Sequence, residues 1–255
     1  MRHLTHTLSL TALCALLTAC ASVSDPPLPP ASEAAYEINP VEAAALKAYP
    51  ALATRNGAEL TLYDRGRVIG QRKSNPQDCG GFATCEVWTF KGPIRLQARP
   101  TATLTDFALL AFEHGEGGQE VVIDKAGKNI PLFGYNASAA PDGRFIATGS
   151  EEMDELNGTS ALVIRDWLNR EATVAFEPSC LPLKWADATH LSVTCTHYPY
   201  NEQTGQFFTW RFDATAGRLG SGRWRLTGSR WITHAQDPEP DNRPLPTFES
   251  VRLRD

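Results

Sequence analysis

The chain has 255 residues, of which 42% are hydrophobic and 21% are charged, and its formal net charge is -5. These values exclude a disordered chain and a polytopic membrane protein. The mild acidity also argues against a dedicated nucleic-acid binder, which is normally strongly basic. We therefore expect a folded protein with a sizeable core and no nucleic-acid partner, in keeping with one all-β domain of about 200 to 250 residues.

Residues 1–19 are predicted to form a signal peptide. Arg2 supplies the positive start, and Leu8–Ala19 is an uncharged, largely apolar run of 12 residues, which is too short to span a bilayer. The run ends in Leu17-Thr18-Ala19-Cys20, which resembles the lipobox of bacterial lipoproteins. The resemblance implies that Cys20 is lipidated and becomes the mature N-terminus. The alternative is an ordinary signal peptide with a chance cysteine.

Residues 20–38 are expected to be the lipidated cysteine and a flexible tether. The stretch Ala21–Ala31 is proline-rich, which suits an extended linker. The lipoprotein resemblance implies three acyl chains, more than the roughly two membrane signals that stable anchoring needs. Ala21 stands where an aspartate is associated with inner-membrane retention in enteric bacteria. The resemblance therefore implies the periplasmic face of the outer membrane; the alternative is the outer leaflet of the plasma membrane.

Residues 39–58 are predicted to form a short helix and a connection. The run Asn39-Pro40-Val41-Glu42 combines an N-cap, a proline at the first helical position and a carboxylate three residues after the cap. Pro50 interrupts the helical pattern. The apolar residues on one helical face are Val41, Ala45, Leu46 and Tyr49. We expect this face to pack on the main domain.

Residues 59–255 are predicted to be a β-rich domain. Leu60–Tyr63 and Glu86–Phe90 are short β-type runs followed by turn residues. The later chain repeats a longer unit of three strands. The three sets are Phe107–Phe112, Gln119–Asp124 and Asn129–Phe133; Phe145–Thr148, Ser160–Arg165 and Glu171–Phe176; and His190–Thr196, Gln206–Phe212 and Arg223–Thr227.

Aspartates recur at equivalent places in these sets, at spacings of 36 to 47 residues. Periods near 40 with several short strands are typical of β-propeller blades. An aspartate suits such turns because its side chain accepts a hydrogen bond from the backbone two residues on. Those expected at the ends of central strands are Asp124, Asp166 and Asp213, and those expected in turns before first strands are Asp106, Asp142 and Asp187.

The turn Pro141-Asp142-Gly143-Arg144 within Ala139–Ala147 resembles the repeat turn of TolB-like and WD40-like β-propellers. Trp185–Leu191 is similar to a degenerate copy of the same motif. The resemblance covers about half of the chain and implies a small propeller-like domain. With residues 59–99 as a further unit it would have about four blades, whose closure is left open. The tail Phe248–Leu253 would complete the first blade; a β-sandwich or an open stack of sheets is the alternative fold.

Of the six cysteines, Cys14 lies in the signal peptide and Cys20 carries the lipid, so four remain in the folded domain. An even number in an oxidising compartment predicts disulfides. A zinc site is the weaker alternative, because the chain has no Cys-x-x-Cys pair. We expect structural disulfides and no metal.

The spacing of these cysteines favours one pairing. Residues on either side of Ala186–Thr189 are predicted to form a hairpin, and pairing Trp185 with His190 places Cys180 opposite Cys195. Directly opposed residues of antiparallel strands lie at a separation that suits a disulfide. The remaining predicted bond joins Cys79 to Cys85.

Sequence motifs for catalysis are missing. The chain contains no Gly-x-Ser-x-Gly elbow, His-Glu-x-x-His motif or phosphate loop. Glu151–Glu155 followed by Asn157-Gly158 fails the EF-hand pattern, so a solvated connection is favoured over a calcium site. The histidines beyond the signal peptide have no acid or nucleophile at a motif spacing; they are His114, His190, His197 and His234. We predict no catalytic residue and no cofactor.

Two features are candidates for a binding surface. Tyr198 and Tyr200 flank Pro199 in a strand connection, where exposed aromatic rings would provide contact area; the alternative is that both rings pack on the core. Charge is also uneven, because residues 113–187 hold 13 acids and 6 bases whereas residues 211–230 hold five arginines and one aspartate. A polar surface of both signs favours contacts with a protein or a polar ligand.

These observations predict a non-enzymatic lipoprotein, bound to the membrane through Cys20, that binds an envelope protein or another envelope component. One specific version is a periplasmic immunity or inhibitor protein that blocks a toxin. The alternative is a propeller-type hydrolase with carboxylates and histidines drawn from different blades. Fold resemblance favours the binding function by analogy only.

Overall fold

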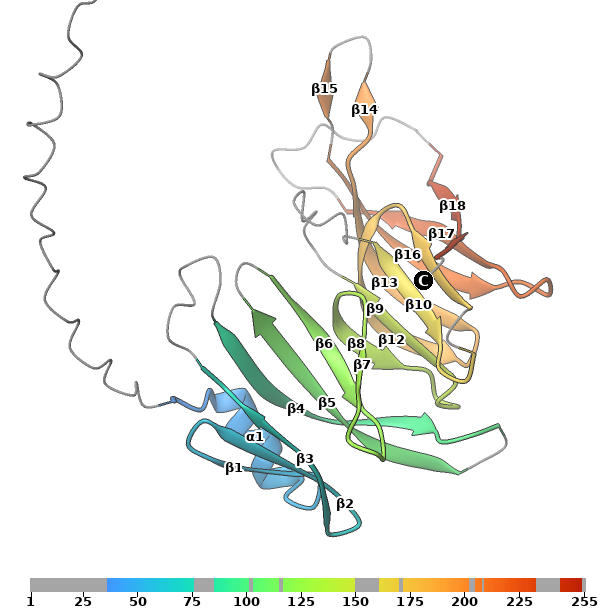
Figure 1. Cartoon of the computed structure of the whole chain (residues 1–255). Helices are drawn as coiled ribbons and strands as arrows, with labels where there is room; N and C mark the ends of the chain where they lie inside the picture. Colours follow the sequence, from blue (N-terminus) through green and yellow to red (C-terminus); the bar gives the residue numbers. More distant parts are fainter. Residues whose placement is uncertain are drawn as a thin grey trace, which may run out of the picture. The chain divides into compact units, whose positions relative to one another are not determined.

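The computed structural model describes most of the chain between residues 36 and 253 (Figure 1). The predicted signal peptide, Cys20 and most of the predicted tether, up to residue 35, lie outside the described residues. Within the described ranges, no helix has the length and apolar character needed to cross a membrane. The described ranges are 36–75, 85–100, 103–114, 117–149, 161–169, 172–201, 205–207, 209–232 and 244–253.

Helix α1 (Pro40–Ala48) begins where the capping residues predict. The Asn39 side chain accepts a hydrogen bond from the backbone N–H of Glu42 at 2.8 Å. The packed face is narrower than the sequence predicts, because Ala45 and Leu46 contact the core whereas Val41 is 64% exposed. The helix packs against β4 (Glu86–Gln97).

The fold is all-β apart from this helix, and the described strands form five antiparallel sheets. The first sheet holds β1 (Ala53–Asn56), β2 (Glu59–Asp64) and β3 (Arg67–Lys73). The second holds β4, β5 (Leu104–His114), β6 (Gly117–Ile123) and β7 (Asn129–Pro131). A small sheet pairs β14 (Tyr200–Asn201) with β15 (Gln206–Phe207).

The other two sheets are larger. In spatial order, the third sheet holds β19 (Val251–Arg252), β11 (Thr173–Phe176), β10 (Leu162–Asp166), β9 (Phe145–Gly149) and β8 (Tyr135–Ala139). The fourth sheet, yellow-orange to red in Figure 1, holds β12 (Ser179–Asp187), β13 (His190–His197), β16 (Trp210–Arg218), β17 (Trp224–Trp231) and β18 (Thr247–Glu249).

The second, third and fourth sheets contain the three predicted sets of strands, but each sheet starts one strand earlier, at β4, β8 and β12. Residues 59–99 therefore do not form one unit. β4 does not belong to the sheet of β2 and β3, because it pairs along its whole length with β5 in the second sheet. β1 lies within residues 39–58, where a connection is predicted, and pairs with β2.

Two strand predictions in the fourth sheet are wrong in detail. The predicted strand Gln206–Phe212 is divided between β15 and β16, and β16 continues to Arg218. Thr215–Gly217, which follow the predicted strand, lie inside β16 and pair with both β13 and β17. An inner strand can carry such residues when both of its neighbours satisfy its backbone.

The C-terminal tail forms strands as predicted, but it does not complete the first unit. β18 pairs with β17 in the fourth sheet, and β19 pairs with β11 in the third. Ser250 lies between them, where its hydroxyl accepts from the Trp224 N–H at 3.1 Å and its own N–H donates to the Trp224 carbonyl at 3.0 Å. Alternation identified the strands but not their partners, because pairing is a long-range property.

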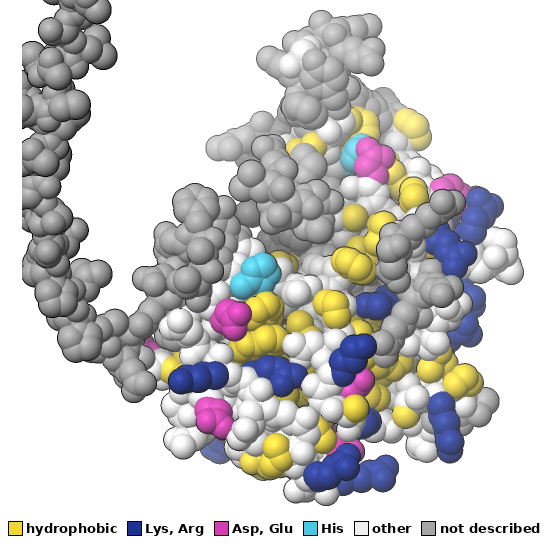
Figure 2. All heavy atoms as spheres, in the orientation of Figure 1, with side chains coloured by type: hydrophobic (Ala, Val, Ile, Leu, Met, Phe, Trp, Pro, Cys, Tyr) yellow, Lys and Arg dark blue, Asp and Glu magenta, His cyan; other side chains and the backbone are white. Residues whose placement is uncertain are grey.

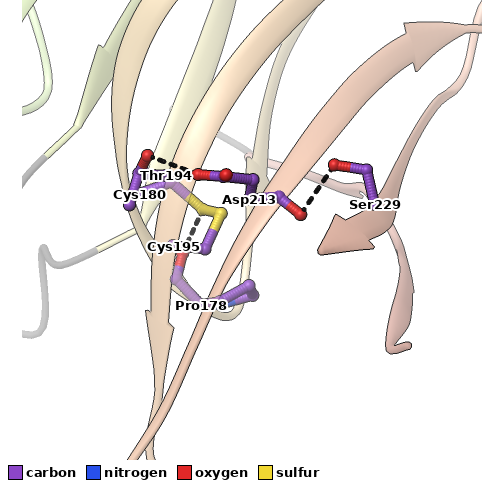
Figure 3. Close-up of a disulfide and its surroundings, with 6 residues drawn as sticks. All are labelled: Pro178, Cys180, Thr194, Cys195, Asp213 and Ser229. Carbon is purple, nitrogen blue, oxygen red and sulfur yellow. Dashed lines mark hydrogen bonds between the residues drawn. A yellow bond between two sulfur atoms is a disulfide. The ribbon is translucent and has the colours of Figure 1, made fainter. Parts of the chain in front are cut away.

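The hairpin of β12 and β13 confirms the disulfide between Cys180 and Cys195, which lie directly opposite each other (Figure 3). The register differs nearer the turn, where Trp185 lies opposite Leu191 rather than His190. A register shift on β12 between Pro182 and Lys184 causes the difference, because the bulge adds one residue to that strand, and a second shift follows between Trp185 and Asp187.

Three groups of buried side chains hold the sheets together. One lies between the first and second sheets and includes Leu60 and Phe90. Another joins the second and third sheets through residues such as Leu96 and Ile146. The third joins the third and fourth sheets and includes Phe212. Each of these pairs of neighbouring sheets therefore shares its own group of buried side chains.

Candidate functional site

Side chains on one face of the fourth sheet are polar, whereas those on the other face form the core. In β16, the buried residues Phe212, Ala214 and Ala216 alternate with more accessible polar ones. The same alternation runs through β13 and the first half of β17. We name the accessible side the threonine–arginine face; its residues are Ser192, Thr194, Thr196, Arg211, Asp213, Thr215, Arg223, Arg225, Thr227, Arg230, Thr247 and Glu249.

Strand register aligns hydroxyl side chains in a row across this face. Ser192 lies opposite Thr215, Thr215 opposite Thr227, and Thr227 opposite Thr247. Directly opposed residues of antiparallel strands are close neighbours, with Cβ atoms about 4.5–5.5 Å apart. The row therefore crosses β13, β16, β17 and β18 as a continuous line of hydroxyl groups.

Arginines of β17 and of the turn before it are held by carboxylates on neighbouring strands. Arg225 Nε donates to Glu249 Oε1 at 2.6 Å, and Arg223 Nη1 lies 4.0 Å from Glu249 Oε2. Arg230 donates from Nε and Nη2 to Asp213 Oδ2 at 3.0 and 2.5 Å. Because such exposed pairs contribute only about 0–1 kcal/mol, their main effect is to orient the guanidinium groups.

Asp213 has a second contact that places it in the middle of the face. Its Oδ1 accepts a hydrogen bond from Thr194 Oγ1 at 3.0 Å, and its carbonyl accepts from Ser229 Oγ at 3.1 Å (Figure 3). The carboxylate is thus bound on one side by β13 and on the other by Arg230. This corrects the prediction that Asp213 ends a strand.

Positive charge exceeds negative charge on this face, which carries four arginines against Asp213 and Glu249, although the whole chain has a net charge of -5. Side chains of Arg223, Arg225 and Arg230 are 65%, 46% and 75% exposed. Dark blue side chains gather on the right-hand side of Figure 2, over β17 and β18. The face is therefore a locally basic surface on an acidic protein.

Large apolar side chains do not contribute to this surface. None of the exposed large hydrophobic residues of the described chain lies on β13, β16, β17 or β18. They are Ile38, Val41, Tyr49, Val68, Phe133, Tyr135, Leu183 and Val251. The threonine–arginine face is thus polar over its described extent.

The predicted binding residues lie elsewhere. Tyr198 follows β13 and is half-buried, and Tyr200 begins β14, where its side chain is outside the described ones. A cluster of half-buried aromatic rings lies nearby on the core side of the fourth sheet. Ring centres in it are 5.1–5.8 Å apart; its members are His197, Trp210, Trp231 and Phe248. Burial lowers the pKa of His197, although Glu177 opposes this effect.

An Asp–His pair occurs at the β12–β13 turn, but its geometry is that of a turn. Asp187 accepts from Thr189 N at 2.6 Å, and its Oδ2 lies 2.9 Å from His190 Nδ1. The Thr189 hydroxyl lies 3.2 Å from the same ring nitrogen, whereas a catalytic triad uses opposite nitrogens for its acid and its nucleophile. Hydrogen bonds from Thr189, followed by that from His190, lower the pKa of Asp187 to about 2.

A surface hollow of about 530 Å³ lies between loops of the second and third sheets. It is lined by Arg99, Phe107 and Trp167, with Lys125 at its side. Lys125 Nζ already donates to Asp64 Oδ1 at 2.9 Å and to the Asp106 carbonyl at 2.7 Å. In the described residues, no three His, Cys, Asp or Glu side chains gather in a way that would hold a metal ion.

The remaining predicted site residues are cysteines. Cys180 and Cys195 are fully buried on the core side of the sheet that carries the threonine–arginine face. Cys85 is also disulfide-bonded, while its predicted partner Cys79 and the predicted lipidation residue Cys20 lie outside the described residues. The Cys79–Cys85 pairing stays a prediction.

The sequence contains the signal for this face but not its geometry. The five arginines of residues 211–230 are visible as a basic segment. Arg223, Arg225 and Thr227 also alternate with the apolar Trp224 and Leu226, as a half-buried strand requires. Only the register of β17 with its neighbours brings them beside the threonines of other strands.

Comparisons of the chain with protein-family models, with curated proteins and with solved structures found no match.

Proposed function

We propose that this protein is a lipid-anchored, non-enzymatic binding module of the bacterial envelope, held at the periplasmic face of the outer membrane through Cys20. Its threonine–arginine face is the surface that meets the partner. The observation that carries the proposal is the row of arginines oriented by Asp213 and Glu249 beside a line of hydroxyl groups. An exposed, oriented set of donors of this kind suits recognition.

The anchor is supported by the lipobox-like Leu17-Thr18-Ala19-Cys20 and by the proline-rich tether that follows it. The folded unit begins soon after the tether, with α1 at Pro40. A lipid at Cys20 would hold the domain at a membrane while the tether leaves it room to move.

We further propose that the domain is a propeller-like repeat rather than a sandwich. Three sheets support this, because each contains a meander of four strands: β4 to β7, β8 to β11, and β12, β13, β16 and β17. Their first strands are neighbours, since β8 packs against both β4 and β12. The turn at Pro141–Arg144 adds support, because Gly143 O accepts from Gln97 N of β4 at 3.0 Å. Propeller-like domains commonly serve as binding platforms, which is support by analogy only.

The anchor is tested by changing Cys20 to alanine in the full chain. We expect the variant to leave the outer-membrane fraction for the soluble periplasm or to stay unprocessed, because no acyl chain can be attached. Membrane fractionation and mass measurement of the N-terminal peptide distinguish these states from the wild type. Cys14→Ala is the matched control, since it removes a signal-peptide cysteine and should leave the fractionation unchanged. Normal membrane association of Cys20→Ala would contradict the proposal.

A further inference from the structure

We infer that the threonine–arginine face binds an anionic polysaccharide, a glycan chain that carries carboxylate groups. This inference rests on the proposed binding function and names the chemical class of its partner. Three properties of the face lead to it: its charge, its rows of hydroxyl groups and its lack of apolar anchors.

The excess positive charge of the threonine–arginine face favours an anionic partner. Arg223, Arg225 and Arg230 are exposed, and the acids beside them, Glu249 and Asp213, leave the face with an excess of positive charge. The guanidinium group matches a carboxylate because it presents N–H donors in a planar fork. Arg225 donates from Nε to Glu249. This contact orients the other N–H donors of the Arg225 guanidinium group but does not neutralise all the arginines of the face.

Hydroxyl groups suit a sugar chain in particular. The line from Ser192 through Thr215 and Thr227 to Thr247 crosses four strands. Each hydroxyl can donate one hydrogen bond and accept two, which matches the hydroxyl groups of a glycan. Thr227 lies between Arg225 and Arg230 along β17, so carboxylates and hydroxyls of one chain can be bound side by side.

The lack of apolar anchors disfavours a protein or a lipid surface. Protein interfaces concentrate their binding free energy in a few buried residues, among which Trp and Tyr are enriched together with Arg. A protein surface that binds a membrane likewise inserts apolar side chains into the bilayer. No exposed large hydrophobic residue of the described chain lies on the strands of this face. A flat polar surface therefore fits an extended, hydroxyl-rich polyanion better than either alternative.

The experiment measures binding of the full-length protein, purified in neutral detergent, to polygalacturonate by titration calorimetry. We expect binding that weakens with added salt, because the contacts are exposed charge pairs. Replacing the three arginines together, R223Q/R225Q/R230Q, should weaken it by about tenfold or more. The matched control is R67Q/K73Q/R95Q, which removes the same charge from exposed positions on β3 and β4 and should leave binding within about twofold.

A second variant tests the hydroxyl row without changing charge. T215V/T227V keeps the β-branched shape, so the strands should form normally. We expect it to weaken polygalacturonate binding severalfold while binding of polyglutamate, an acidic polymer without sugar hydroxyls, stays unchanged. Unchanged thermal unfolding of all variants confirms that each is folded.

Each contrary outcome overturns the inference. Polyglutamate that binds as tightly as polygalacturonate would favour an acidic protein segment, and vesicles containing phosphatidylglycerol that bind more tightly would favour a lipid surface. Equal weakening by both triple variants would show a non-specific charge effect, and no binding of polygalacturonate would exclude the class. The proposed function fails separately, if Cys20→Ala fractionates as the wild type does.

Discussion

At the residue scale, the Glu42–Arg55 ion pair connects the start of the domain to its core. Both side chains are fully buried, and Glu42 Oε1 lies 2.8 Å from Arg55 Nη2. The same oxygen accepts from the Phe90 N–H at 2.9 Å, and Arg55 also donates to the Trp88 carbonyl. The pair therefore joins α1 to both β1 and β4, although the sequence predicts Glu42 only as part of the helix cap.

Breaking this pair should destabilise the protein strongly. We expect Glu42→Leu alone to lower the free energy of unfolding by about 3–5 kcal/mol, because Arg55 would be left buried without its counter-charge. The double variant Glu42→Leu/Arg55→Met should recover part of the loss, but not all of it, because the Phe90 N–H would lose its acceptor. Urea unfolding measures each value.

Lys47→Met is the control for the helix, since Lys47 is exposed in the last turn of α1. Its effect should stay within about 0.5 kcal/mol. A loss below about 1 kcal/mol for Glu42→Leu would contradict a central role for the pair.

Glu120 is a second buried carboxylate, with only 3% of the residue exposed. Its Oε2 accepts from the Ala137 N–H at 2.6 Å. Burial raises the pKa of Glu120 above its ordinary value, and the Ala137 hydrogen bond and nearby Lys91 oppose this only in part. The folded state therefore binds this proton more tightly than the unfolded state does.

The raised pKa of Glu120 makes the stability of the protein depend on pH. The protonated carboxyl group contributes its full stabilisation below the unfolded pKa near 4.5. This stabilisation is lost as the pH rises through the higher folded pKa. We expect Glu120→Gln to remove this loss, so that the variant gains stability relative to the wild type as the pH rises from 4 to 8, on the scale of about 1 kcal/mol per pKa unit. Urea unfolding across this range measures it, and parallel pH profiles for the two proteins would contradict the assignment.

At the element scale, four of the six recurring aspartates form the predicted turns. The Asp124, Asp142, Asp166 and Asp187 side chains each accept a hydrogen bond from the backbone N–H two residues on, at Ala126, Arg144, Leu168 and Thr189. The other two lie within strands, Asp106 in β5 and Asp213 in β16. The predicted turn chemistry is therefore confirmed for these four aspartates and wrong for the other two, because spacing alone does not separate turn aspartates from strand aspartates.

Glycines allow neighbouring sheets to approach closely. A Cβ on Gly149 of β9 would lie 1.7 Å from the Cys180 carbonyl oxygen of β12. Gly127, in the turn after β6, has a φ of +81°, and a Cβ there would lie 1.8 Å from the Ile69 carbonyl oxygen of β3. These contacts are with backbone atoms, so a side chain at either position requires the sheets to move apart.

Gly149→Ala tests this packing between the third and fourth sheets. We expect it to lower the free energy of unfolding by about 2 kcal/mol or more, because the new methyl group overlaps the Cys180 carbonyl. Gly220→Ala is the matched control, since a Cβ there meets nothing within 4 Å. Thermal unfolding compares the two, and equal midpoints would contradict the close approach.

At the scale of the whole molecule, the C-terminal strands tie two sheets together. β18 extends the fourth sheet and β19 extends the third, and Leu253 N donates to the Thr173 carbonyl at 2.9 Å. The proposed anchor at Cys20 and the threonine–arginine face lie far apart in the sequence. The proposed anchor and the proposed binding role together describe a protein that holds its partner near a membrane.

By itself, the sequence determined what depends on local patterns. Capping residues located α1, and the alternation of apolar and polar residues identified the all-β class and most strands. Hairpin arithmetic identified the Cys180–Cys195 bond. These features follow from interactions between residues near one another in the chain, so a short segment carries the information.

The tertiary structure alone decided which strands are partners and what they bring together. It placed the tail in the third and fourth sheets, buried Glu42 against Arg55, and aligned Thr215, Thr227 and Thr247 beside the arginines of β17. Alternation shows which side of a strand is buried, but any strand edge can satisfy the same backbone donors and acceptors. The choice among edges depends on packing of the whole core, which no single segment encodes.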